Sequence, residues 1–412
     1  MKFSMSLPAA LGLLLVLAGC AQLPPAEPAP TMILVSVDGF RPDYLDLDGA
    51  RNLRALAAQG VRAEAMHPSF PSITFPNHYT LVTGLRPDHH GVVDNTMEDP
   101  GIAGERFSLS NQKAVIDHRW WDQAEPMWVT AEKHDVKTAV MFWPGSEAAI
   151  HGVRPTDFRP FDSKVVANDR VDVVLGWLDR PLASRPRVLA LYFDDVDHAG
   201  HTFGPGSAEV AASVALVDTA IGRLMDGLRA RGIAANVVVV SDHGMASTSA
   251  QRVIAFSGIA PADSYRVVTM GPYVGVNAQP GQEGVLAAAL LKPHEHLQCW
   301  RKGEIPARFH YGQNARVPQF FCSADVGWTI VPGGPKDRMP KGGTHGYDNM
   351  APEMQALFIA AGPSFKQGVV LPPFDNVDVY PLLMNLIGVP ALPSDGSLAP
   401  LAPALKTVGS QR

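Results

Sequence analysis

The sequence lacks two features that would favour a nucleic-acid-binding or a membrane-spanning protein. It has no excess of positive charge: its 412 residues carry a formal net charge of −6, which argues against binding nucleic acid by neutralising phosphates. This charge does not exclude a small phosphorylated substrate, because bound metal ions can invert the local field. With 46% hydrophobic and 18% charged residues, the composition is that of a globular protein rather than a disordered one.

A long apolar run is also absent. The run "LGLLLVLAGC" at residues 11–20 is too short to span a bilayer as a permanent helix. A basic start, a short apolar stretch and small residues indicate a secretory signal instead. Because "LAGC" resembles a bacterial lipobox, we expect a signal peptide at residues 1–20 with Cys20 lipidated; a plain signal peptide is the alternative. The Pro-rich residues 21–31 would form a tether, and Ala21 favours the periplasmic face of the outer membrane.

Cysteine is scarce, with three in the whole chain. Once Cys20 is assigned to lipidation, Cys299 and Cys322 remain. In an oxidising compartment two leftover cysteines indicate a disulfide, and the alternative is a pair of free buried thiols. The sequence therefore predicts that these two cysteines are bonded in the exported protein.

Short apolar runs alternate with helical patterns along the chain. Such runs are typical of buried strands, and we expect strands in residues 31–37, 187–193 and 235–240, with others in 137–143 and 353–362. Helical spacing occupies residues 50–59, 207–231 and 377–387, and each of these segments is followed by a glycine, at 60, 232 and 388. The alternation predicts an α/β fold, a mostly parallel sheet with helices on both faces. Residues from about 250 to 335 fit this rhythm poorly, so we expect a small insertion that carries the cysteine pair.

Aspartate and histidine recur where the predicted strands end. Asp38 follows one strand, Asp242 and His243 follow another, and "DDVDHAGH" at residues 194–201 follows a third. A glycine-rich loop adds His345. A lone aspartate at such a position is most often a helix cap or a turn former. Ligands of open α/β sheets bind beyond the carboxyl ends of the strands, and aspartate and histidine are usual zinc ligands, so their joint occurrence predicts a metal site.

Spacing distinguishes some of the candidate ligands from their neighbours. Asp197 and His201 are four residues apart, so a helical turn would let both reach one ion, whereas His198 is the alternative beside the aspartate. We expect the other histidines near these motifs to be structural or on the surface: His67, His78, His89 and His90.

The stretch "FPSITFPNHYT" at residues 70–80 places two hydroxyl residues between prolines. Pro71 and Pro76 restrict the backbone, which predicts a stiff, non-helical turn over residues 72–74. Either Ser72 or Thr74 could supply a nucleophile there, and such a hydroxyl needs activation at neutral pH.

Five motifs in this order resemble the nucleotide pyrophosphatase/phosphodiesterase family of the alkaline phosphatase superfamily. They are "VDGFRPDY", "PSITFPNHYTLVTGLRPDHHGVVDN", "DVDHAGH", "SDHGM" and "GTHGYDN". The similarity runs from about residue 32 to 390, and "FHYGQNARVP" in the expected insertion also resembles the family. The resemblance implies an alkaline-phosphatase-like catalytic domain over residues 32–400, with the insertion at about 250–335.

Carried over by position, the resemblance implies two zinc ions per chain. One set of ligands would be Asp197, His201 and His345. The other would be Asp38, Asp242 and His243, with Thr74 as its reactive oxygen ligand.

The resemblance also implies roles in binding the substrate. It favours Thr74 over Ser72 as the nucleophile, and it implies that Asn95 in "VVDN" bonds a non-bridging phosphate oxygen. Phe75 offers an aromatic face for a base, and Tyr192 is a further expected substrate-binding residue. An aromatic that family members often carry near "RPTDFRPFD" falls on Asp157 or Phe158.

The expected function is hydrolysis of phosphodiester or pyrophosphate bonds of nucleotides through a phosphothreonyl intermediate, which releases nucleoside 5′-monophosphates. The resemblance also leaves open a phosphodiesterase for another substrate, such as a choline-containing lipid or a phosphonate ester. A phosphomonoesterase and a non-catalytic zinc-binding lipoprotein are weaker alternatives. The expected partners are a small phosphodiester and, through the lipid anchor, a membrane, with no nucleic-acid binding; the sequence does not indicate the oligomeric state.

Overall fold

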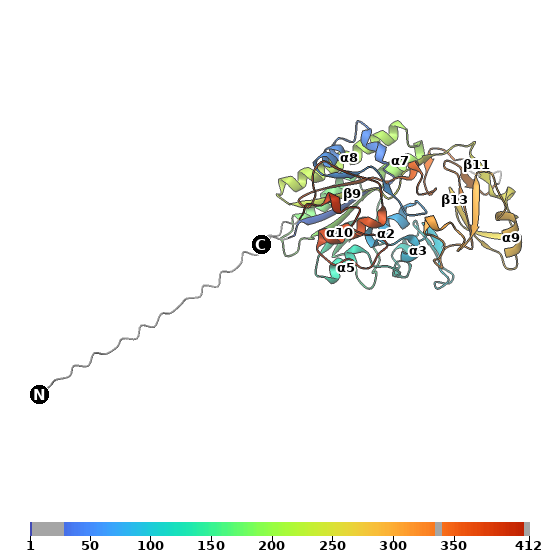
Figure 1. Ribbon diagram of the computed structural model, residues 1–412, viewed down its shortest axis with the longest axis horizontal. Helices are drawn as coiled ribbons and strands as arrows, with labels where there is room; N and C mark the ends of the chain where they lie inside the picture. Colours follow the sequence, from blue (N-terminus) through green and yellow to red (C-terminus); the bar gives the residue numbers. More distant parts are fainter. Residues whose placement is uncertain (2–28, 334–339, 408–412) are drawn as a thin grey trace.

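An eight-stranded sheet occupies the centre of the computed structural model, which describes residues 1, 29–333 and 340–407 (Figure 1). Within this sheet only β18 runs antiparallel to its neighbours, which confirms the predicted mostly parallel sheet. The predicted lipidation at Cys20 lies outside the described residues. In spatial order the strands are β19 (Val369–Leu371), β2 (Val61–Ala63), β18 (Phe358–Ala361), β9 (Ala235–Val240), β1 (Thr31–Val37), β8 (Val188–Phe193), β6 (Thr138–Met141) and β7 (Asp157–Arg159).

Helices cover both faces of this sheet. The side chains of β1 point alternately to the two faces and are apolar on both, so each face needs a cover. Met32 and Leu34 belong to one hydrophobic core, and Ile33 and Val35 belong to the other. Figure 1 shows the corresponding helices on the two sides of β9. On one side lie α1 (Arg51–Gln59), α6 (Ala167–Leu178), α7 (Asp195–Phe203) and α8 (Ala208–Ala230); on the other lie α2 (Thr74–Thr83), α5 (Met127–Lys133) and α10 (Val379–Ile387).

Two local expectations are corrected at the ends of elements. Thr31, where the expected tether and the expected first strand overlap, belongs to the strand: it is the first residue of β1 and pairs with Ala235 of β9. Thr74, expected in a non-helical turn, is the first residue of α2. Pro76 is tolerated there because it lies in the first helical turn, whose N–H groups have no partner within the helix.

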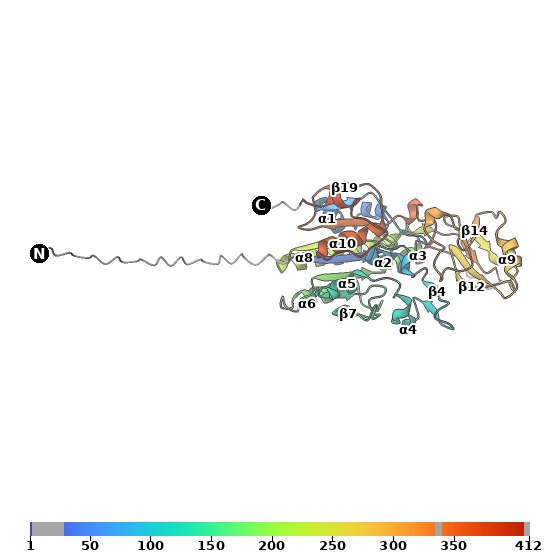
Figure 2. The same cartoon turned by 60° about the horizontal axis from the view of Figure 1, so that its bottom comes forward.

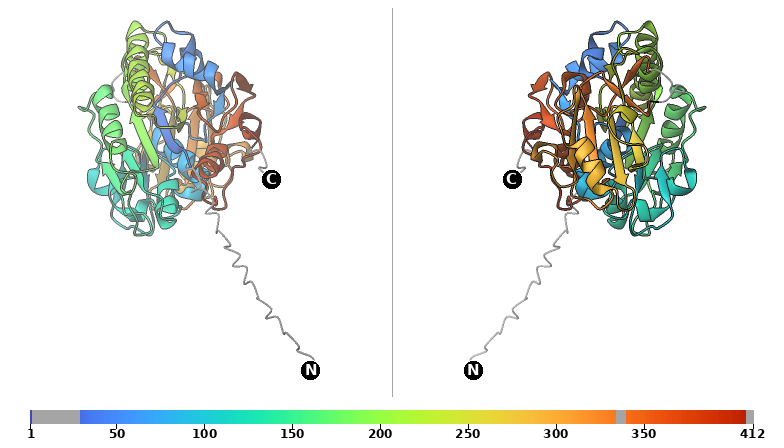
Figure 3. Two further views of the ribbon diagram at one scale, coloured as in Figure 1. Left: turned by 90° about the vertical axis from the view of Figure 1, so that its left-hand side faces the viewer. Right: turned by 90° about the vertical axis from the view of Figure 1, so that its right-hand side faces the viewer.

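The expected insertion, which the structure describes up to residue 333, forms a second, smaller sheet at one end of the molecule (Figure 2). In the right-hand view of Figure 3 this gold-coloured part lies in front of the central sheet. It has a hydrophobic core of its own, and all pairings in its four-stranded sheet are antiparallel. Its elements are β12 (Tyr265–Met270), β13 (Tyr273–Ala278), β15 (Phe320–Ala324) and β14 (Leu297–Arg301), with α9 (Glu283–Leu290) and the pair β11 (Val253–Ala255) and β16 (Thr329–Val331).

Short elements complete the described chain. Two-stranded pairs are formed by β3 (Met66–His67) with β20 (Phe374–Asp375), β4 (Thr96–Glu98) with β5 (Arg106–Ser108), and β10 (Ala246–Ser247) with β17 (Gly343–Thr344). The remaining α-helices are α3 (Pro87–His90) and α4 (Gln112–Val115), and the 3-10 helices are Pro42–Asp46, His118–Trp120, Phe256–Gly258, Ala307–Phe309, Pro352–Met354, Asn376–Asp378 and Ala402–Ala404. Across the described ranges no helix has both the length and the hydropathy to cross a membrane.

The predicted disulfide is confirmed within the smaller sheet. Cys299 of β14 and Cys322 of β15 face each other directly across the two strands and are bonded. Because the bond joins neighbouring strands of the insertion, it constrains that part rather than the central sheet.

Replacing both cysteines by alanine should therefore loosen the insertion alone. A cross-link that closes a loop of this size contributes about 3 kcal/mol by restricting the unfolded chain. Hydrogen exchange should show lost protection in β14 and β15 and unchanged protection in β1, β8 and β9. Equal loss of protection in both sheets would contradict this account.

Candidate active site

The carboxyl ends of three adjacent parallel strands deliver the predicted acidic residues to one place. Asp38 follows β1, Asp242 follows β9 after one residue, and α7, which carries Asp197, begins two residues after β8. Gly39 allows the close approach: its φ is +67°, and a Cβ on it would lie 3.1 Å from Cα of Asp197. The strand order thus brings together carboxylates that are far apart in the sequence.

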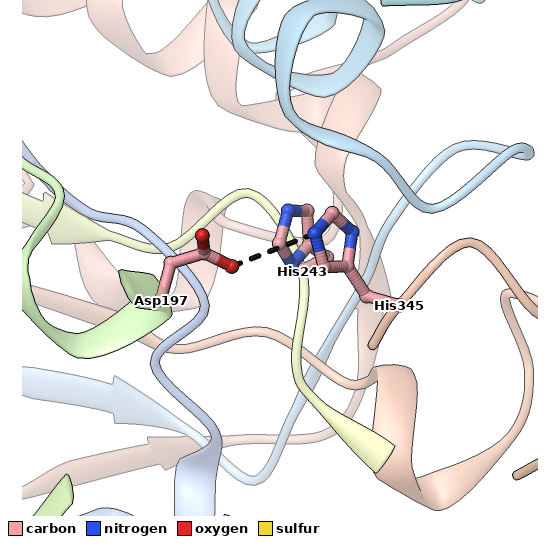
Figure 4. Close-up of side chains that lie close together, drawn as sticks. All are labelled: Asp197, His243 and His345. Atoms are coloured by element: carbon pink, nitrogen blue, oxygen red, sulfur yellow. Dashed lines mark ion pairs between the residues drawn. The ribbon is translucent and has the colours of Figure 1, made fainter. Parts of the chain in front are cut away.

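The first predicted ligand set is assembled in the structure. His201 Nε2 lies 3.1 Å from His345 Nε2 and 3.4 Å from Asp197 Oδ2. Asp197 Oδ1 lies 3.5 Å from His345 Nε2, the contact drawn in Figure 4. The helical spacing expected for Asp197 and His201 is that of α7, which also carries His198. Ligand atoms of Asp197, His345 and His243 of the second set also lie within 4.8 Å of one another.

The second predicted set lies directly beside the first. His243 Nε2 is 2.9 Å from Asp242 Oδ2 and 3.4 Å from Asp38 Oδ1. The Thr74 hydroxyl is 3.3 Å from the same nitrogen. The His243 ring stacks on the His345 ring with centroids 3.5 Å apart, so the two sets form one continuous cluster (Figure 4).

Hydrogen bonds fix which nitrogen of each histidine is free to bind a metal. Nδ1 of His201 faces the carbonyl of Gly343, and Nδ1 of His345 faces the carbonyl of Ser72. Nδ1 of His243 faces the carbonyl of Gly244. A carbonyl oxygen only accepts hydrogen bonds, so each Nδ1 carries a proton and each ring turns its Nε2 toward the cluster. This is the arrangement in which histidine binds metal ions.

Buried ionisable groups crowd together in the cluster, and their pKa values shift in different directions: His243 and His78 hold the pKa of Asp242 well below its ordinary value despite its burial. Burial, together with the charges of Asp242 and Asp197, raises the pKa of Asp38 well above its ordinary value. Burial and the neighbouring His243 and His201 hold the pKa of His345 well below its ordinary value, which keeps that ring neutral. Among the described residues, Asp38 Oδ1 and Asp197 Oδ1 are buried and accept no hydrogen bond. Unpaired carboxylate oxygens beside imidazole nitrogens fit bound cations.

The two hydroxyls of the proline-flanked segment have different surroundings. Ser72 is fully buried, and its hydroxyl donates to the carbonyl of Tyr347 at 2.9 Å. Thr74 lines a cavity of about 310 Å³ together with Asn95. Asn95 Oδ1 accepts from the N–H of Phe75 at 2.9 Å, so its amide NH2 group is the part left to donate to a ligand.

His78, expected to be structural or on the surface, is fully buried directly behind the cluster. Its Nδ1 lies 2.9 Å from the carbonyl of Thr74 and 3.3 Å from Asp242 Oδ2, and its Nε2 lies 2.8 Å from the Ser36 hydroxyl. The Asp38, His78 and Asp242 ligand atoms lie within 4.8 Å of one another. The signal available in the sequence was its four-residue spacing from Thr74, which puts both on one face of α2.

The cavity beside Thr74 is lined by aromatic and acidic groups. Phe75 and Tyr192, both predicted to bind substrate, line it, and the Tyr192 hydroxyl also donates to Asp38 Oδ2 at 2.6 Å. Within "RPTDFRPFD" it is Phe161 that lines the cavity, and its side chain is half exposed. Neither Asp157 nor Phe158 lines it, because both lie in β7 at the edge of the sheet.

Comparison with known proteins agrees with this geometry. The family model for type I phosphodiesterase / nucleotide pyrophosphatase matches residues 32–348. A protein of Schizosaccharomyces pombe named as an uncharacterized pyrophosphatase/phosphodiesterase is 40% identical, over 89% of this chain and 79% of its own. Mouse ectonucleotide pyrophosphatase/phosphodiesterase family member 3 is 36% identical over 94% of this chain, which spans only 45% of the mouse protein.

Solved structures give the same result. Murine ectonucleotide pyrophosphatase/phosphodiesterase 5, as an inactive threonine-to-alanine variant in complex with AMP, aligns with a TM-score of 0.87 at 33% identity. The alignment covers 92% of this chain and all of that one. On the match to the family model, the identity with these relatives and the shared fold, the chain belongs to the type I phosphodiesterase/nucleotide pyrophosphatase family of enzymes.

Proposed function

We propose that the chain is a two-zinc hydrolase of nucleotide phosphodiester and pyrophosphate bonds, with Thr74 as nucleophile. One observation carries the proposal: the Thr74 hydroxyl stands 3.3 Å from His243 Nε2, on the cavity and beside the Asp/His cluster. A threonine hydroxyl needs activation to attack a phosphate, and a metal-ligand cluster at its side supplies that activation.

The donor groups of the cluster suit zinc, which binds carboxylate oxygens and neutral histidine nitrogens. The first ion would be held by Asp197, His201 and His345. The second would be held by Asp38, Asp242 and His243. When bound, the two ions lower the pKa of an attacking oxygen and stabilise the negative charge of a displacement at phosphorus.

Thr74 and Asn95 have different roles in the proposed reaction. Thr74 Oγ attacks phosphorus, the bond to the leaving oxygen breaks on the opposite side, and the phosphoryl group becomes attached to threonine. Asn95 donates its amide N–H to a non-bridging phosphate oxygen, since its carbonyl oxygen already accepts from Phe75. Thr74 is the first residue of α2, so the positive end of the helix dipole also faces the phosphate. Water then attacks the phosphothreonyl ester and releases a monophosphate.

Two aromatic rings of the cavity, Phe75 and Phe161, suit a nucleoside as the group that is retained on the phosphate. Stacking of a base on such a ring contributes roughly 1–3 kcal/mol. Two facts about the murine relative support the assignment: it has been solved with AMP bound, and a threonine-to-alanine variant of it is inactive. We therefore expect nucleoside 5′-monophosphates as products.

The metal requirement can be measured directly. Protein stripped with a chelator and then reloaded should bind two zinc ions per chain and recover its diesterase activity, because each set of three ligands forms an open catalytic site. Elemental analysis alongside the activity assay checks this. One ion per chain, or activity that survives removal of the metal, would disprove the two-metal proposal.

Thr74→Ala should lower kcat by roughly 10³-fold or more, as removal of a nucleophile does in other hydrolases. Zinc content and folding should stay the same, because the ligands from Asp and His remain. Thr74→Ser should keep part of the activity, since a hydroxyl is still present. Ser72→Ala is the matched control, and a Ser72→Ala enzyme that is inactive beside an active Thr74→Ala enzyme would identify Ser72 as the nucleophile.

The enzyme should cleave nucleotide diesters far faster than the corresponding monoesters. A monoester carries nearly two negative charges, and among the described residues that line the cavity there is no arginine or lysine to bind the second one. Phe75→Ala should harm nucleotide diesters by ~1–3 kcal/mol in kcat/KM and an aryl methyl phosphate much less. Equal losses on both substrates, or a preference of the wild type for monoesters, would overturn this assignment.

A further inference from the structure

The loop that carries Asn95 is held by two tyrosines of the insertion. The hydroxyl of Tyr273, the first residue of β13, donates to Asp94 Oδ2, and Asp94 is the residue next to Asn95. The hydroxyl of Tyr311 donates to the carbonyl of Val93 at 3.2 Å. The other carboxylate oxygen of Asp94 accepts from the backbone N–H of Thr96 at 2.8 Å. The two residues that precede Asn95 are therefore fixed by the insertion, and Asp94 in turn holds the backbone of Thr96 on the other side of Asn95.

The same tyrosines belong to an aromatic cluster that reaches the nucleophile. Phe321 stacks on Tyr273 with centroids 5.0 Å apart and packs edge-on against Phe70 at 5.6 Å. Phe70 also contacts Tyr311 at 5.6 Å and Phe309 at 4.2 Å. All five rings are buried, and Phe70 stands four residues before Thr74. The insertion therefore packs on the segment that leads into α2.

Tyr273 also touches the loop of His345. Gly346 has φ +111°, and a Cβ on it would lie 2.9 Å from the Tyr273 ring and 3.0 Å from the side chain of Ile73. Ile73 directly precedes Thr74. The segments that carry the phosphate donor, the nucleophile and a histidine ligand thus all meet at the first residues of β13.

We infer that Tyr273 is a positioning residue of the hydrolase: through Asp94 it holds Asn95 where its amide meets the phosphate. The inference rests on the proposed function, in which Asn95 is that donor. A carboxylate in the interior is stable only when its oxygens are hydrogen-bonded, and the Tyr273 hydroxyl supplies one of the bonds that Asp94 needs. The insertion therefore acts in catalysis by fixing the geometry of a loop that it does not contain.

The charge of Asp94 gives this link a measurable signature. Burial raises the pKa of Asp94 to about 6. Hydrogen bonds from Tyr273, the Thr96 N–H and Thr269 act in the opposite direction, as does the charge of Arg106. Burial raises the pKa values of both Tyr273 and Tyr311, and the charge of Asp94 in turn helps to raise them. Deleting the Tyr273 hydroxyl removes a donor to the ionised form, so the pKa of Asp94 rises further. As the pH falls, Asp94 in the Tyr273→Phe variant therefore becomes protonated, and stops holding the loop, at a higher pH than in the wild type.

A double-mutant cycle tests whether Tyr273 acts through Asn95. With the p-nitrophenyl ester of thymidine 5′-monophosphate as the probe, Tyr273→Phe should lower kcat/KM about tenfold at neutral pH. In an Asn95→Ala background the same substitution should cost almost nothing further, because the group it positions is gone. Tyr380→Phe, which deletes another buried tyrosine hydroxyl far along the chain in α10, should leave the rate unchanged. If Tyr273→Phe does not fold, the volume-conserving Asp94→Asn takes its place in the cycle.

The pH profile separates positioning from a general loss of stability. The loss of kcat/KM caused by Tyr273→Phe should be several-fold larger at pH 6 than at pH 8, with zinc content unchanged. In an Asp94→Asn background the loss caused by Tyr273→Phe should no longer depend on pH. Losses of kcat/KM that add up in the double-mutant cycle would overturn the inference, and so would a Tyr273→Phe loss of the same size at both pH values. In either case a loss of kcat/KM in Asn95→Ala alone would still uphold the proposed function. An Asn95→Ala enzyme with the wild-type rate would overturn both.

Discussion

Three carboxylates brought close together in a buried site are the constraint on which the rest of this structure depends. Asp38, Asp197 and Asp242 lie at the carboxyl ends of parallel strands or just beyond them, and all three are buried or nearly so. In a medium of low dielectric such a group is unstable unless cations balance it. Two observations indicate this need for cations: the pKa of Asp38 is raised, and one oxygen each of Asp38 and Asp197 is buried without a hydrogen bond among the described residues.

The hydrogen bonds and the backbone geometry around the cluster also suit the binding of cations by these carboxylates. The histidines commit Nδ1 to backbone carbonyls, so that their Nε2 atoms face the carboxylates. Gly39 lets the backbone after Asp38 approach Asp197, and His78 links Asp242 to the backbone of Thr74. Under the proposed function, cations bound by these two candidate groups would both balance the buried carboxylates and activate the Thr74 hydroxyl beside them.

The sequence predicted the features that are encoded locally. Apolar runs and helical spacing gave the strands of the central sheet and the helix α8, whose observed bounds, Ala208–Ala230, lie one residue inside the expected ones at each end. The Asp/His motifs indicated the cluster, because residues after parallel strands share one edge. Features that depend on packing between distant segments could not be predicted in this way. Phe161 rather than Phe158 reaches the cavity, and only the fold reveals that Tyr273 of the insertion meets the loop of Asn95.

The central claim concerns where cations bind, and anomalous diffraction at the zinc edge tests it most directly. Crystals of the zinc-loaded protein should show two peaks. One should lie among Asp197, His201 and His345, and the other among Asp38, Asp242 and His243 within reach of the Thr74 hydroxyl. A single peak, or a second peak bound by His78 in place of His243, would contradict the account.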